Sequence, residues 1–144
     1  MSLKRIPKEV TVISKTILLI NSEPNVREVM QDYLSYPNGW QVLNANSPLE
    51  GLEYAAQVQP DAVIFDLSTF GMNFLAFLKR LRLQPPNQNT PVVLVAEKKW
   101  LDSELLQEFQ IAGVIDFYTD AASIPQQVAK LLNWDEVPLV EKIE

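Results

Sequence analysis

The feature that most constrains the fold of this chain is a repeated alternation between short apolar runs and segments of helical periodicity. Apolar runs of strand length occur five times, at residues 16–20, 40–45, 61–65, 92–95 and 112–118. Between them, apolar residues return every three or four positions, which is the spacing of one helix face. The first such segment contains Val26, Val29, Met30, Tyr33 and Leu34. The pattern predicts five strands, each followed by a helix.

Strands that are apolar on both faces and joined by helices are typical of a parallel sheet covered on both sides. Because crossover connections are right-handed, the predicted fold is an α/β, doubly wound five-stranded parallel sheet. We expect one domain over residues 16–133, with an arm at 1–15 and a tail or the start of a linker at 134–144. Ligands of such sheets bind beyond the carboxyl ends of the strands.

Local signals set the expected helix boundaries. Asn25 and Glu28 have the spacing of a capping box at the start of the first helix. Ser47 followed by Pro48 predicts the start of the second. The fourth helix is predicted from Leu101, Leu105 and Phe109, which share one face.

Composition excludes several classes of function. The 144-residue chain has 12 basic and 18 acidic side chains, a net charge of −6, which argues against nucleic-acid binding by this domain. It has no Cys and no His, so disulfides, zinc sites and His-based catalytic triads are not expected. No apolar run approaches the roughly 20 residues of a membrane helix. No signal peptide is evident, so we expect a cytoplasmic location and no membrane partner.

The residues that follow the predicted strands define the candidate site. Only four glycines occur and none clusters after the first strand, so no nucleotide-binding fingerprint is present. Instead, strand one leads into Asn21, Ser22 and Glu23, and strand three ends at Asp66. Strands four and five are expected to end near Ala96 and Asp120. An Asp at a strand end either caps a turn or belongs to a functional site.

Four segments point to one family. They are "EPNVREVMQDYL", "PDAVIFDLSTFGM", "TPVVLV" and "AGVIDFY", in that order along the chain. Over residues 16–132 the sequence resembles the response-regulator receiver domains of two-component phosphorelay signalling. The resemblance implies a flavodoxin-like (βα)5 fold with strand order 2-1-3-4-5, a phosphoacceptor Asp and an acidic pocket for Mg²⁺.

The family's functional positions carry over unevenly onto this sequence. The phosphoacceptor falls on Asp66, and the switch aromatic of strand five falls on Phe117. The metal-binding acidic pair falls on Asn21 and Ser22, which carry no charge, and the carbonyl donor on Ser68.

Two further positions change the chemistry of the pocket. The hydroxyl position falls on Ala96, and the conserved Lys of the resemblance falls on Asp120, a reversal of charge. Glu23 is either a second carboxylate for Mg²⁺, beside Asp66, or an acid favoured by the start of a helix. Lys98 is either a substitute cation or a surface residue. We therefore expect a degenerate member of the family that has no catalytic residues and no cofactor. The alternative is that the pocket binds Mg²⁺.

Three functions follow from these residues. The first is a protein-interaction module that presents the surface of helix four, strand five and helix five to a histidine kinase, an output domain or a second copy. The second is a working phosphoacceptor, phosphorylated at Asp66 by a histidine kinase. The third is a small-ligand-binding flavodoxin-like module that uses the same crevice.

Overall fold

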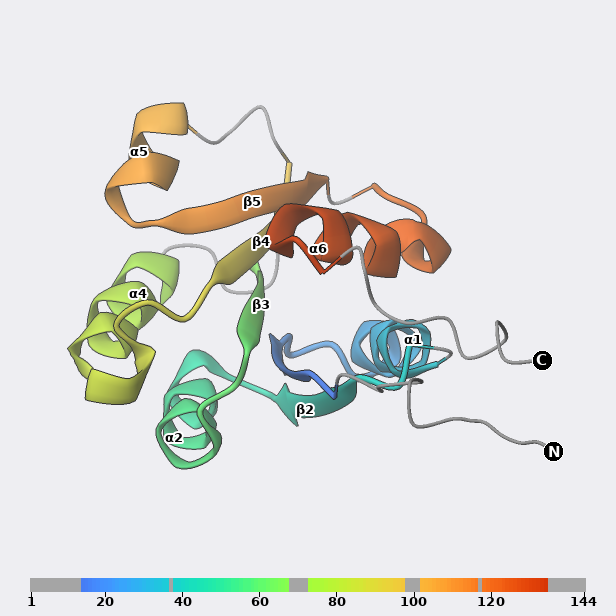
Figure 1. The fold of residues 1–144 in the computed structure, drawn as a ribbon, viewed down its shortest axis with the longest axis horizontal. Helices are drawn as coiled ribbons and strands as arrows, with labels where there is room; N and C mark the ends of the chain where they lie inside the picture. The colour runs from blue at the N-terminus through green and yellow to red at the C-terminus, as the bar shows by residue number, and fades with distance from the viewer. Residues whose placement is uncertain (1–13, 37, 68–72, 98–101, 117, 135–144) are drawn as a thin grey trace, which may run out of the picture.

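The computed structural model describes residues 14–134, apart from residues 37, 68–72, 98–101 and 117 (Figure 1). Five strands form one parallel sheet in the order β2-β1-β3-β4-β5, which confirms the predicted fold class and strand order. The strands are β1 (Thr16–Ile20), β2 (Gln41–Ala45), β3 (Ala62–Asp66), β4 (Val92–Ala96) and β5 (Ile111–Asp116). All neighbouring pairs are parallel, so the carboxyl ends of the strands meet at one edge of the sheet.

Helices cover both faces of the sheet, as Figure 1 shows. The α-helices are α1 (Pro24–Ser35), α2 (Pro48–Val58), α4 (Asn73–Leu83), α5 (Ser103–Glu108) and α6 (Ile124–Leu132). In the described part of the chain, the short 3₁₀ helices η2 (Pro85–Asn87) and η4 (Ala121–Ser123) precede β4 and α6. No helix in the described part of the chain is long and apolar enough to span a membrane.

Alternation along each strand divides the apolar core into two layers. Ile17 and Leu19 of β1 pack with Met30 and Leu34 of α1, in a cluster that includes α6. The intervening Leu18 and Ile20 pack against α2 and α4 on the opposite face. Because successive side chains of a strand point to opposite faces, a strand with two buried faces must be apolar throughout. This requirement is the reason that the sequence revealed the strands so clearly.

The helix boundaries follow local hydrogen bonds. Ser47 caps α2 as predicted, because its Oγ accepts a hydrogen bond from the Glu50 backbone N–H at 3.1 Å. The capping box predicted at Asn25 is wrong. Helix α1 begins at Pro24, with Glu23 as its N-cap residue and no side-chain cap bond.

Leu101, one of the three residues that predicted the fourth helix, lies outside the described residues. Helix α5 contains Leu105 but is shorter at its C-terminal end than the pattern predicted. It ends at Glu108, and Gln110 then adopts a left-handed conformation with φ of 58°. A single left-handed residue reverses the chain direction after a helix. Phe109 therefore lies beyond the helix, where it packs against the α2/α4 layer of the core.

Trp134, the first residue of the predicted tail, packs against the folded domain. Trp134, placed in the tail by the sequence, is buried in the α1/α6 layer. Its ring lies edge-on to Trp40, with centroids 5.3 Å apart, and the Lys15 ammonium lies 4.9 Å from the ring of Trp134. Asn133, with φ of 62°, turns the chain so that the Trp134 N–H donates to the Ala129 carbonyl at 2.7 Å. Trp134 is therefore part of the folded body.

Candidate functional site

Asp66 is the acidic residue at the centre of the carboxyl edge. It is the last residue of β3, it is 2% exposed, and its Cα is in register with Val95 of β4. Its Oδ2 accepts a hydrogen bond of 2.6 Å from Nδ2 of Asn21. Asn21, directly after β1, is fully buried. The structure therefore brings together two of the residues that the sequence placed in the pocket.

The Asn21 side chain is held at both ends. Its Oδ1 accepts a hydrogen bond of 2.6 Å from the backbone N–H of Glu23, while its NH₂ group donates to Asp66. An N–H can only donate and an ionised carboxylate can only accept, so these partners fix which end of the amide is oxygen. Arg27 of α1 donates from Nη1 to the Asn21 backbone carbonyl at 2.7 Å. The amide is therefore built into the start of α1.

Ser22 and Glu23, the other two polar residues after β1, are exposed. Glu23 occupies the N-cap position of α1, and its backbone N–H is engaged by Asn21. An acid at that position is favoured by the partial positive charge of a helix N-terminus. This placement agrees with the interpretation of Glu23 as a residue of the helix start.

The end of β5 differs from the prediction. The strand stops at Asp116, four residues before Asp120. The reason is a turn: Asp116 Oδ1 accepts from the Tyr118 N–H and its backbone carbonyl accepts from the Thr119 N–H, both at 2.9 Å. Such local hydrogen bonds turn the backbone away from the hydrogen-bonded pairing of β5 with β4.

Asp116 rather than Asp120 therefore stands at the strand end next to β4. Ala96, buried at the end of β4, has its Cα in register with that of Asp116. Asp120 is exposed and is the N-cap residue of η4. Ser68, Phe117 and Lys98 lie outside the described residues.

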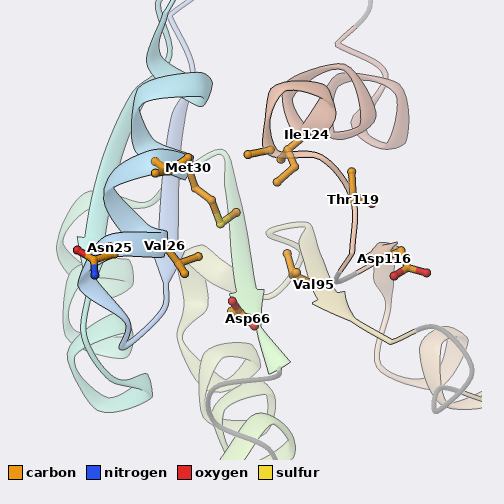
Figure 2. A pocket seen from close by; sticks show the side chains of 10 residues that line it. Asn25, Val26, Met30, Asp66, Val95, Asp116, Thr119 and Ile124 are labelled. Carbon is orange, nitrogen blue, oxygen red and sulfur yellow. The ribbon is translucent and has the colours of Figure 1, made fainter.

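A cleft of about 370 Å³ opens beside Asp66, between α1 and the segment that leads into α6 (Figure 2). Its lining is mostly apolar, and the two ionisable residues among the ten described lining residues are both Asp. The lining residues are Asn25, Val26, Val29, Met30, Asp66, Val95, Asp116, Thr119, Ala121 and Ile124. Asp120 is not among them.

The described side chains fit a bound Mg²⁺ poorly. Mg²⁺ requires octahedral oxygen ligands and is usually held by one or two carboxylates with several waters. Here Asp66 has the Asn21 NH₂ group against one carboxylate oxygen, and the amide oxygen faces the Glu23 N–H. Among the residues that the structure describes, no three acidic, His or Cys side chains gather into a metal site.

A second polar contact joins the loops after β4 and β5. The Tyr118 hydroxyl donates to Glu97 Oε2 at 2.9 Å, while the Tyr118 ring remains 76% exposed. The hydrogen bond to Glu97, with the negative charge of that carboxylate, raises the pKa of Tyr118 above its usual value. The sequence did not single out this pair.

Two further residues of the site were missed by sequence reasoning. Arg27 acts through a backbone carbonyl, an acceptor that every residue provides, so no sequence pattern marks the contact. Asp116 was detectable as an acid within the predicted fifth strand, yet the strand's true end depends on a turn that the apolar pattern does not record.

A parallel sheet of this strand order, with an Asp closing its central strand, is the arrangement expected of the receiver domains that the sequence resembles. A model of the response regulator receiver domain matches residues 17–130, and the chain belongs to this family. It is 30% identical over 103 residues to a probable C4-dicarboxylate response regulator, DctR, of Priestia megaterium, covering 71% of this chain and 43% of that protein. The chain thus spans less than half of that relative.

Two other comparisons agree. The chain is 22% identical over 115 residues to sporulation initiation phosphotransferase F of Bacillus subtilis, covering 80% of this chain and 89% of that protein. The chemotaxis response regulator CheY4 of Vibrio cholerae superposes with a TM-score of 0.71 at 19% identity, covering 83% of this chain and 99% of that structure. This last likeness concerns the fold alone.

Proposed function

We propose that this receiver domain of a two-component system acts mainly through protein–protein interaction, with a phosphorylation pocket whose metal chemistry has been lost. The observation that carries the proposal is the 2.6 Å hydrogen bond from the Asn21 amide to the Asp66 carboxylate. The neutral amide of Asn21 contacts Asp66, the phosphoacceptor position. Asn21 follows β1, where the family resemblance places metal-binding acids.

Charge supports the same conclusion. Phosphoryl transfer depends on positioning and on stabilising negative charge. The Lys that the resemblance implies is replaced by Asp120, and a second acid, Asp116, lines the same cleft as Asp66. Ala96 has no hydroxyl to contact a phosphoryl group. Each of these replacements removes an attraction, and Asp116 adds a repulsion.

The surface proposed for partners consists of α5, β5 and α6. β5 is the edge strand of the sheet, and five of its six residues are only partly buried. Tyr118 follows it with its ring exposed and its hydroxyl fixed on Glu97, an arrangement suited to presenting an aromatic contact. A histidine kinase, an output domain and a second copy of the chain are the candidate partners.

A working phosphoacceptor is the second candidate function. The observation that favours it is the position of Asp66, which ends the central strand and lines an open cleft. In this alternative, the Asn21 amide moves aside when a phosphodonor and Mg²⁺ bind.

Intact mass after incubation with acetyl phosphate and Mg²⁺ separates the two. We expect no phosphoryl adduct on the wild-type chain, and we expect one on the triple variant Asn21→Asp, Ser22→Asp, Asp120→Lys. The matched control adds Asp66→Ala to the triple variant, and it should stay unmodified. A stoichiometric wild-type adduct that disappears in Asp66→Ala would overturn the proposal in favour of the second candidate.

A further inference from the structure

A second hollow lies on the face of the sheet opposite the cleft beside Asp66. Helices α2 and α4 lie side by side on that face (Figure 1), and a groove of about 310 Å³ opens between them. We call it the α2/α4 groove, and its lining includes Ser47, Leu49, Leu52, Ala76, Phe77 and Arg80. Its volume is at the lower end of the range of small-molecule sites, roughly 300–1,000 Å³.

The α2/α4 groove offers an apolar surface that the fold leaves partly uncovered. Leu52 and Phe77 are buried members of the α2/α4 layer of the core, 8% and 1% exposed. Leu49, at the start of α2, is 61% exposed. Removing apolar surface from water is favourable in proportion to its area, so a ligand with an apolar body gains by covering Leu49.

Arg80 is the charged group of the α2/α4 groove. The last turn of α4 contains two arginines, and they have different surroundings. The Arg82 guanidinium donates to the backbone carbonyls of Asn87 and Thr90, at 3.1 and 2.7 Å. Arg80 is exposed, and within the described part of the chain its guanidinium has no hydrogen bond or ion pair. Its five N–H donors are therefore available to a ligand.

The surroundings leave the positive charge of Arg80 in place. Glu50 of α2 accepts hydrogen bonds from the Asn46 N–H at 2.6 Å and from the Tyr54 hydroxyl at 3.4 Å. Neither Glu50 nor Glu53 is among the described lining residues, of which Arg80 is the one that ionises. Residues 68–72, which precede α4 and lie outside the described part, contain no ionisable side chain. The charge of the groove therefore favours an anion.

We propose that the α2/α4 groove binds a small organic anion, a carboxylate whose apolar body covers Leu49 and whose carboxylate accepts hydrogen bonds from Arg80. The planar guanidinium matches a carboxylate with two parallel hydrogen bonds. Ser47 accepts from the Glu50 N–H, which leaves its own O–H as a second donor to the ligand. The site goes beyond the proposed interaction function and needs neither a phosphodonor nor a metal.

Three probes of one shape test the charge preference: 3-phenylpropionate, 3-phenylpropanol and 3-phenylpropylamine. Each is titrated into the full chain in EDTA at low salt, and the methyl signals of Leu49, Leu52 and Ala76 are followed by NMR. We expect saturable shifts at these methyls. Because Arg80 is exposed, the gain from its charge is modest, and the carboxylate should bind at least threefold more tightly than the alcohol. The amine should bind most weakly.

Two variants and a control assign the effect to the α2/α4 groove. Arg80→Gln should remove the difference between carboxylate and alcohol. Lys79→Gln removes the neighbouring exposed charge of α4, which is not among the described lining residues, and it should leave the difference intact. Ala76→Phe adds a ring at an exposed lining residue, so the affinity for all three probes should fall at least fivefold.

Three results with the wild-type chain would each overturn the inference. They are equal binding of carboxylate and alcohol, shifts confined to other parts of the molecule, and no saturation by about 10 mM carboxylate. Unchanged affinity in a folded Ala76→Phe variant would do the same. The α2/α4 groove and the cleft beside Asp66 share no described lining residue, so failure here is separate from any result on phosphorylation.

Discussion

Replacing Asn21→Asp introduces an acid at a position where the resemblance implies one, and it tests the role of the amide directly. In the wild-type chain, Asn21 Nδ2 lies 2.6 Å from Asp66 Oδ2, in a site where both residues are buried. Losing a hydrogen bond to a charged group costs about 1.5–3 kcal/mol. Two unit charges about 3 Å apart also repel by about 5–6 kcal/mol at an effective dielectric of about 20.

Proton uptake by the two carboxyl groups limits this loss of stability. Two adjacent carboxylates avoid double ionisation by sharing a proton. Holding a carboxyl of ordinary pKa near 4 protonated at pH 7 costs about 4 kcal/mol, since each unit is worth 1.36 kcal/mol. A shared proton also restores a hydrogen bond between the two side chains. We therefore expect Asn21→Asp to lower the free energy of unfolding by about 3–4 kcal/mol at pH 7.

The pH dependence has a definite sign. The shared proton is bound more tightly in the folded variant than in the unfolded chain, so the penalty grows as pH rises. It should shrink by about 1.4 kcal/mol for each pH unit below 7, down to about pH 5.

Urea denaturation followed by Trp fluorescence, in EDTA and in millimolar Mg²⁺, measures the effect. Two facing carboxylates suit Mg²⁺, so the ion should recover most of the loss in Asn21→Asp and should leave the wild type unchanged. Asn25→Asp, at an exposed position in the first turn of α1, is the matched control and should shift stability by less than about 1 kcal/mol. Equal stability of Asn21→Asp and wild type in EDTA at pH 7 would refute the reasoning.

Three other perturbations test the fold and the loops. Asn87→Ala should cost about 1–3 kcal/mol in urea denaturation, because the fully buried Asn87 amide donates to the Ala55 carbonyl and Gln84 Oε1 and accepts from Thr90 Oγ1, and these hydrogen bonds would be lost. Glu97→Ala should lower the pKa of Tyr118 toward its usual value in an ultraviolet absorbance titration. In the wild type, the raised pKa of Tyr118 stabilises the folded state at pH values below the pKa that Tyr118 has in the unfolded chain. This contribution is lost as the pH rises through the pKa of Tyr118 in the folded chain. An unmoved pKa would remove Glu97 as the cause. Trp134→Ala should cost about 3 kcal/mol, whereas Tyr36→Ala, at an 81% exposed residue, should cost less than about 0.5 kcal/mol.

The sheet was predictable because burial on two faces leaves a direct mark in the sequence. Strands β3 and β4 are buried at every residue, and each is an unbroken apolar run up to its final position. The family resemblance then supplied the strand order, which periodicity alone does not determine. The position of Asp66 at the end of β3 followed from the same pattern.

Boundaries that depend on polar contacts were predicted less well. The apolar pattern of 112–118 continues past the end of β5, and only the turn bonds of Asp116 show where the ladder stops. Asp120, on which the resemblance places the charge reversal, is exposed in the segment that follows this turn. The buried packing of Trp134 was also hidden, because it depends on Trp40, a residue distant in the sequence.

The role of Asn21 illustrates a different limit. Its neutrality was visible in the sequence, and it indicated a weakened metal site. The hydrogen bond to Asp66 was not visible, because it joins residues 45 positions apart through the pairing of β1 with β3. The sequence shows that position 21 lacks an acidic metal ligand. It does not show that the Asn21 amide contacts Asp66, because that contact becomes visible only when the ends of β1 and β3 lie side by side.

The most direct test of the central claim is a Mg²⁺ titration of the isotope-labelled wild-type chain, observed at the side-chain NH₂ signals of Asn21. These protons lie against Asp66, so any ion that binds the carboxylate must disturb them. We predict that Mg²⁺ up to millimolar concentrations leaves both NH₂ signals of the wild-type chain in place. The Asp66→Asn substitution by itself should move the signals, because it removes the charge that the NH₂ group contacts. Saturable movement of the wild-type signals with Mg²⁺ would contradict the account.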